Sequence, residues 1–125
     1  MIAAPSSVAR ALERGHRIDI TTIGRHSGLP RRIELVFHNV GGRILISGKP
    51  GFPRGWIANL RANPEMTFHL KGPMAVADLP AHGRVITDIA ERRELMAPIA
   101  AGWGYPVETM VSGSPLIEVT FPEGA

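Results

Sequence analysis

Short apolar runs, separated by glycine- and proline-rich breaks, dominate the hydrophobic pattern of the chain. In Arg17–Ile23, Ile18 and Ile20 alternate with polar neighbours, which is the period of a half-buried strand. Similar runs predict further strands at 32–37, 43–47, 66–70, 74–79, 83–87 and 116–121. The Gly-rich turn at 39–42 is typical of a hairpin.

Helical spacing interrupts this series three times. A helix is predicted at 6–14, where Val8 and Leu12 share a face, and another at 54–62, which Asn63-Pro64 ends. A capping box, made by an aspartate and a glutamate three residues apart, starts a third helix at residue 88. We expect Pro98 to bend or shorten it.

Six or seven short strands with inserted helices favour an antiparallel barrel over a parallel βαβ fold. The fold class is therefore mainly β with short helices. The chain has 125 residues, of which 44% are hydrophobic and 20% charged, a profile that predicts one domain spanning residues 1–125.

Charge divides the chain into two unlike halves. Residues 1–62 carry ten Lys or Arg against three Asp or Glu, whereas residues 63–125 carry four against eight. Twelve of the fourteen cations are arginine, the side chain suited to bidentate contact with phosphate and carboxylate. An anionic partner is therefore the first functional expectation, and charge alone does not separate nucleic acid, an acidic membrane surface and a phosphorylated cofactor.

The densest chemistry lies at 21–32, TTIGRHSGLPRR. Gly24 and Gly28 permit positive φ, so backbone N–H groups can converge beside the Ser27 hydroxyl and three guanidiniums. This predicts a phosphate cradle. A tight hairpin whose arginines only solvate the surface fits the spacing equally well.

Weaker signals follow the basic loop. Lys49 stands in a strand-end loop that could meet the same anion, although the P-loop spacing is absent. Trp56, Trp103 and Tyr105 are three of only seven aromatic residues, and a flat ring system would favour such partners.

Several classes of chemistry are excluded or disfavoured. The chain has no cysteine, and its five histidines stand singly without metal-ligand spacing, so no metal site is expected. No Gly-x-Ser-x-Gly elbow is present, so a bound cofactor is expected to supply any chemistry. No apolar run reaches the roughly 18 residues of a membrane span, and the N-terminal segment does not read as a signal peptide, so a cytoplasmic location is expected.

Three segments together carry a resemblance: TTIGRHSGLPR, GGRILISGKPG and GWIANLRANPEMTFHLKG. They resemble the deazaflavin-dependent nitroreductase and quinone reductase family, whose members bind coenzyme F-420 in a split β-barrel related to FMN-binding barrels. The likeness is strongest over 21–70 and continues more loosely to residue 121. It implies an oxidoreductase that passes a hydride from reduced F-420 to a quinone, enone or nitro acceptor.

The resemblance also implies roles for particular residues. Those expected to hold the cofactor phosphate and tail, with one aromatic beside the deazaflavin, are Arg25, His26, Ser27, Gly28, Arg31, Arg32, Lys49 and Trp56. Tyr105, with Trp103 as its neighbour, is expected on the acceptor side, where a phenol can stabilise or protonate the reduced product.

Departures from the family pattern predict a different substrate preference. His26 stands where lysine is usual, Ile33-Glu34 replaces an Asn/Thr-Pro pair, and Gly48 replaces a common serine. Alternatives remain an FMN-binding reductase of the same fold and a non-catalytic carrier of F-420, haem or a lipid. Nucleic-acid binding is not expected, since the strands lack interleaved arginines and aromatics. The protein is expected to be a monomer or homodimer, with peripheral membrane contact left open.

Overall fold

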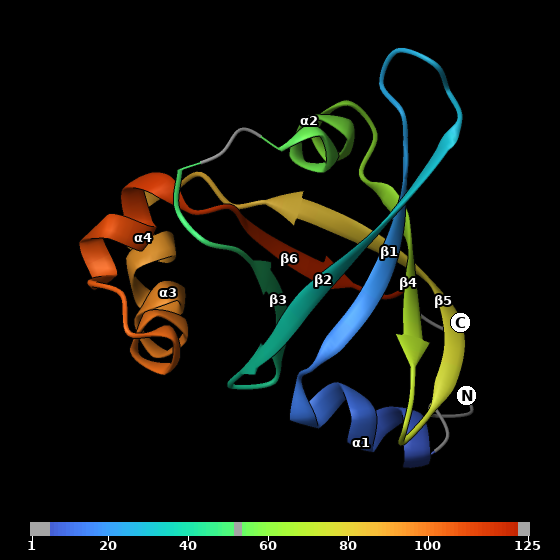
Figure 1. Cartoon of the computed structure of the whole chain (residues 1–125), viewed down its shortest axis with the longest axis horizontal. Coiled ribbons are helices and arrows are strands. Elements are labelled where there is room, and N and C mark those ends of the chain that lie inside the picture. Colours follow the sequence, from blue (N-terminus) through green and yellow to red (C-terminus); the bar gives the residue numbers. More distant parts are fainter. Residues whose placement is uncertain (1–5, 52–53, 123–125) are drawn as a thin grey trace.

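Six antiparallel strands close into a barrel in the computed structural model, which describes residues 6–51 and 54–122 (Figure 1). Around the barrel the order is β1 (Arg17–Ile23), β2 (Pro30–Val40), β3 (Arg43–Ser47), β6 (Leu116–Thr120), β5 (Val76–Val85) and β4 (Glu65–Lys71). β4 pairs with β1, which closes the ring. The predicted β-rich barrel with short helices is confirmed.

Four helices accompany the barrel in the described part of the chain: α1 (Ser6–Arg14), α2 (Gly55–Ala62), α3 (Ile89–Trp103) and α4 (Val107–Gly113). Figure 1 shows α2 over one end of the barrel and α3 packed with α4 beside β3. The Asp88 side chain accepts a hydrogen bond from the Glu91 N–H at 2.9 Å, as the capping box predicts. Among the described helices, none is both long and apolar enough to cross a bilayer.

Three details differ from the sequence-based expectation. β5 is one strand rather than two, and it runs through Pro80. Only His82–Val85 of β5 pairs with β6, so Pro80 lies where one strand edge is unpaired and its missing N–H costs no ladder bond. α3 continues past Pro98 to Trp103. α4 was not predicted at all, because its short segment lies between glycines and a proline.

The core consists of two hydrophobic clusters. The first fills the barrel, where Phe37 and Phe68 meet at 5.2 Å between ring centroids, and α2 adds Trp56 and Leu60 to it. The second lies between the outer face of the barrel and the α3–α4 pair, and includes Leu45 and Met96 among other residues. β3 is therefore buried on both faces, which explains its uninterrupted apolar run.

A four-charge network joins α3 to the barrel. Arg43 donates to both carboxylate oxygens of Glu118 at 2.9 Å and to Glu91 at 3.0 Å, and Arg84 also donates to both acids. Hydrogen bonds from Arg43, and then from Arg84, lower the pKa of Glu118 from 4.5 to about 2. The network fixes β3, β5, β6 and α3 relative to one another.

Candidate functional site

The loop between β1 and β2 is tied closed by its own hydrogen bonds. Gly24 N–H donates to the Leu29 carbonyl and Gly28 N–H to the Gly24 carbonyl, both at 2.8 Å. Gly28 has a φ of 71°, a left-handed conformation that favours glycine. At Gly24 a Cβ would lie 2.6 Å from the Ser27 hydroxyl oxygen and 3.1 Å from the Leu29 carbonyl oxygen, so a side chain here would displace the Ser27 hydroxyl.

This closure changes how the loop can hold an anion. Besides the two glycine N–H groups, the Leu29 N–H donates to Ser27 Oγ at 3.1 Å and the Arg25 N–H to Asn59 Oδ1 at 3.1 Å. These four backbone donors are therefore occupied within the protein. These four N–H groups do not form the cradle of converging donors that the glycines suggested. The donors left for a ligand include the side chains of the loop.

Asn59 of α2 anchors this loop, and sequence reasoning missed it. Its side chain is 6% exposed, its Oδ1 also accepts from Arg25 Nη1 at 3.1 Å, and its Nδ2 donates to Thr22 Oγ1 at 3.1 Å. Arg25 Nη1 donates as well to the Gly55 carbonyl at 3.3 Å. The available signal was a polar residue one helical turn after Trp56, on the face that α2 buries.

The loop and α2 enclose a pocket of about 440 Å³. Its lining residues are Thr22, Gly24, Arg25, His26, Ser27, Arg31, Arg32, Ile33, Gly55, Trp56 and Asn59. The pocket brings together six of the eight residues predicted to hold the cofactor. Its described lining contains three arginines and no aspartate or glutamate, so it favours an anionic group.

The cations of this pocket differ in how far they are already neutralised. Arg32 Nε donates to Asp19 at 2.8 Å, and hydrogen bonds from Lys71 and then Arg32 hold the pKa of Asp19 below its usual range. Arg31 contacts only Ser27 Oγ, at 3.5 Å, among the hydrogen bonds of the described residues. Arg31 is therefore the pocket's most available guanidinium.

The side chains of Trp56, Ile33 and Glu34 differ in whether they reach the pocket. Trp56 is 6% exposed and belongs to the barrel core, so only a small part of the residue is available to the pocket. Glu34 pairs with Lys71 and Arg17 on the outside of the barrel, whereas Ile33 lines the pocket. The departure at Ile33-Glu34 thus places an aliphatic side chain, not a charge, in the pocket wall.

The remaining predicted residues lie outside this pocket's lining. Gly28 belongs to the same loop, and Lys49 is exposed after β3, with its carbonyl accepting from Arg54 Nη2 at 2.7 Å. Trp103 meets the His38 ring edge-on at 5.1 Å between ring centroids, and burial lowers the pKa of His38. Trp103 and Tyr105 both pack partly buried against the second core cluster.

Tyr105 follows directly on the end of α3. Gly104 caps the helix with a φ of 74°, and the Tyr105 N–H donates to the Ala100 carbonyl at 3.1 Å. Within the described residues the phenol hydroxyl has no hydrogen-bond partner. It is therefore available to a bound molecule, although the structure does not bring it into the lining of the basic pocket.

The sequence matches the model of one protein family, described as F-420H(2)-dependent quinone reductase, over residues 3–112. The chain belongs to this family. Family membership makes it an oxidoreductase that works with coenzyme F-420, as the resemblance implied.

Solved structures extend the likeness at the level of the fold. An F-420-H2 dependent reductase (FDR-A) is 21% identical, with 83% of this chain and 93% of that chain covered and a TM-score of 0.60. A Clostridium acetobutylicum protein of the pyridoxinephosphate oxidase family is 12% identical over 93% and 82%, with a TM-score of 0.66. A domain-swapped dimer is 20% identical over 92% and 95%, with a TM-score of 0.60. These neighbours establish the split-barrel fold.

Proposed function

We propose that this family member reduces a quinone, enone or nitro-type acceptor and that the basic pocket beside α2 holds the anionic part of F-420. The observation that carries the assignment of the pocket is its described lining, which combines three arginines with part of Trp56 and lacks any carboxylate. A phosphate group and a glutamate tail are the anionic parts that the resemblance assigns to the cofactor. The acceptor classes rest on the same resemblance.

The donor set fits a phosphate better than a neutral ligand. Arg31 offers a planar fork that matches phosphate oxygens, and Ser27 lies within reach of Arg31 to orient it. His26 is exposed and lines the same pocket, so its ring nitrogens are within the ligand's surroundings. Asn59 acts indirectly, because it holds Arg25 and the loop against α2.

Bound reduced F-420 supplies the hydride, and the protein's own groups position the reactants and stabilise the product. Arg31 and Lys49, on two different loops, are proposed to clamp the tail. Tyr105 is proposed to donate a hydrogen bond or a proton from its free hydroxyl to the reduced acceptor, which carries developing negative charge. Trp56 is proposed to lie beside the ring.

Binding titrations test the cofactor assignment directly. F-420, FMN and a DNA oligomer are each titrated against the protein at physiological salt, with fluorescence as the readout. We expect saturable binding of F-420 only. Tighter binding of FMN would instead favour the FMN-dependent alternative, and F-420 binding without turnover of any acceptor would favour a carrier.

Substitution of Tyr105 by phenylalanine tests the acceptor side. Removal of only the hydroxyl should lower the turnover of a quinone about a hundredfold at saturating F-420, with the dissociation constant of F-420 unchanged. Trp103→Phe is the companion variant, because it changes the neighbouring aromatic without touching the phenol. Equal turnover in Tyr105→Phe and wild type would show that Tyr105 serves only to pack against the helices.

A further inference from the structure

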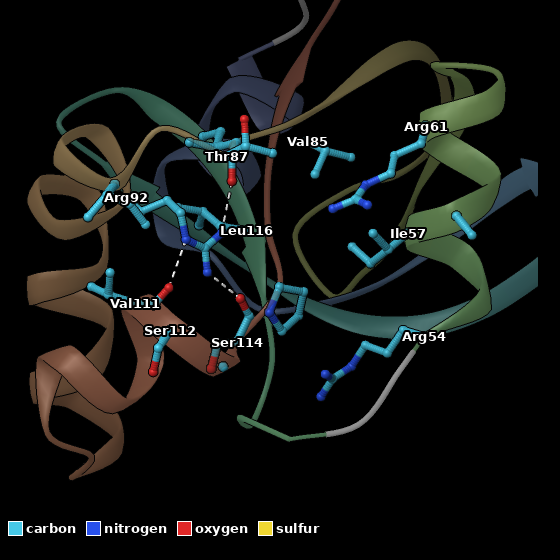
Figure 2. A pocket seen from close by; sticks show the side chains of 15 residues that line it. Arg54, Ile57, Arg61, Val85, Thr87, Arg92, Val111, Ser112, Ser114 and Leu116 are labelled. Atoms are coloured by element: carbon cyan, nitrogen blue, oxygen red, sulfur yellow. Dashed lines mark hydrogen bonds between the residues drawn. The ribbon is translucent and has the colours of Figure 1, made fainter.

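A second and larger pocket, of about 660 Å³, lies against a different face of α2 from the basic pocket. Figure 2 shows α2 on one side of this space and the turn between α4 and β6 on the other. Pockets that bind small molecules commonly have volumes of roughly 300–1,000 Å³. The space is therefore large enough for an organic ligand.

The charged side chains in the described lining of this second pocket are all positive. Its described lining includes Arg54, Arg61 and Arg92 and contains no aspartate or glutamate. Figure 2 shows the side chains of Arg61, in α2, and of Arg54, just before α2, on this side of the pocket. Arg61 makes no hydrogen bond or salt bridge with any described residue, so its guanidinium can bind an anion without breaking an existing contact.

Arg92 has a different task from the other two. It is buried, and it donates to the carbonyls of Ile86 at 2.8 Å and Val111 at 2.9 Å and to that of Ser114. Its donors are thus directed to backbone oxygens, and the contacts fix the wall of the pocket. Burial lowers the pKa of Arg92, but an arginine remains charged at neutral pH.

The hydroxyl groups of the lining differ in access. Thr87 and Ser112 are exposed, whereas Ser114 is only 4% exposed and its hydroxyl oxygen is buried without surface that a ligand in the pocket could contact. Arg61 is therefore the donor on which recognition of an anion rests.

The rest of the lining is apolar. Ile57 of α2, Val85 at the end of β5 and Leu116 at the start of β6 lie around the space, and Ile89 at its edge is 52% exposed. An inorganic ion would leave this surface in contact with water. An apolar body attached to an acidic head would cover it and gain the free energy of burial.

We propose that this pocket is a second binding site, for a small amphipathic anion with an apolar chain and one carboxylate or phosphate. The site is separate from the cofactor site, because Trp56 and Asn59 of α2 face one pocket whereas Ile57 and Arg61 face the other. The acidic head binds Arg61, and the chain lies on Ile57, Val85 and Ile89. The inference does not depend on which acceptor the enzyme reduces.

The experiment uses octanoate and octyl phosphate as probes, titrated calorimetrically into the full-length protein, with 1-octanol and inorganic phosphate as half-probes. We expect saturable one-to-one binding of octanoate or octyl phosphate, and the tighter of the two identifies the head group. Arg61→Ala should weaken that binding about tenfold. Arg10→Ala, an exposed arginine of α1, is the matched control and should bind as wild type does.

Three results would overturn the proposal. They are the absence of saturable binding by both acidic probes, equal binding of 1-octanol, and unchanged affinity in Arg61→Ala. A competition titration with F-420 separates the two sites. Simultaneous binding supports a second site even if the cofactor assignment of the basic pocket fails, whereas mutual displacement would mean that the acidic probe occupies the cofactor site.

Discussion

The two pockets on different faces of α2 both present arginine, and Arg31 in the first and Arg92 in the second show two opposite uses of this side chain. Beside the hairpin, Arg31 has only Ser27 as a hydrogen-bond partner and stays exposed. Beside the α3–α4 pair, Arg92 is buried and directed to backbone carbonyls. Arg31 is therefore left available to a ligand in the first pocket, whereas Arg92 builds the wall of the second, where Arg61 is the guanidinium left for a ligand.

The difference shows that the charge of a side chain does not by itself identify a binding residue. A guanidinium directed to carbonyl oxygens contributes to folding, whereas one with few partners is available for recognition. Substitution of arginines that pack against α3 and α4 should therefore change mainly the free energy of unfolding. Substitution of arginines in the loop between β1 and β2 should change mainly the affinity for a ligand.

The largest effect is expected for Arg92→Met. The substitution keeps an unbranched side chain of similar length but leaves several buried carbonyls without their donor, which should cost about 3–5 kcal/mol of unfolding free energy. Urea unfolding of wild type and variant measures it. Arg93→Met, which removes an exposed arginine paired with Glu108, should change stability by less than about 1 kcal/mol. Similar losses in the two variants would contradict the wall-building role of Arg92.

Acid should destabilise the protein on the same side. The pKa of Glu118 is lowered in the folded state, so its stabilising contribution is complete above about pH 5 and is lost as the pH falls toward about 2. The shift from 4.5 to about 2 corresponds to roughly 3 kcal/mol. Urea unfolding of wild type and Glu118→Gln, repeated from neutral to acid pH, should show two stabilities that converge. A constant difference would mean that this carboxylate does not titrate as its arginine contacts imply.

On the hairpin side, Arg31→Ala should weaken F-420 binding at least tenfold. One charge-assisted contact to phosphate is worth roughly 1.5–3 kcal/mol, and Arg31 has little internal role to lose. Unfolding should change little, which separates affinity from stability. Arg14→Ala, an exposed arginine of α1, serves as the control. If both variants bind F-420 as wild type does, the hairpin arginines only solvate the surface.

The smallest effect is expected at His26. It is exposed and lines the same pocket as Arg31, so loss of its side chain in His26→Ala should weaken F-420 binding only a few-fold. The dissociation constants of wild type and variant measure this effect. Equal values would show that His26 does not contact the cofactor.

Sequence reasoning succeeded where the information was local. Strand alternation predicted most of the barrel, and the contiguous motif at 21–32 supplied seven of the residues that line one pocket. It failed where the outcome depended on distant partners. β5 continues through Pro80 because β6 does not pair with the strand at that position. Asn59 anchors the loop between β1 and β2 because that loop packs on α2 in the folded protein. The second pocket is lined by residues from α2, the end of β5, α4 and β6, so no contiguous sequence motif predicts it.

A substitution at Gly113, next to the α3–α4 side, would also affect the loop that carries Lys49. Its carbonyl accepts from the Gly51 N–H at 3.1 Å, and a Cβ at Gly113 would lie 3.2 Å from the Pro50 Cβ. Any side chain there pushes on the loop that carries Lys49, far away in sequence. If Lys49 holds the cofactor tail, divergence at position 113 would therefore be selected through cofactor affinity, and the permissible residues at 113 and in the 48–51 loop would change together during evolution.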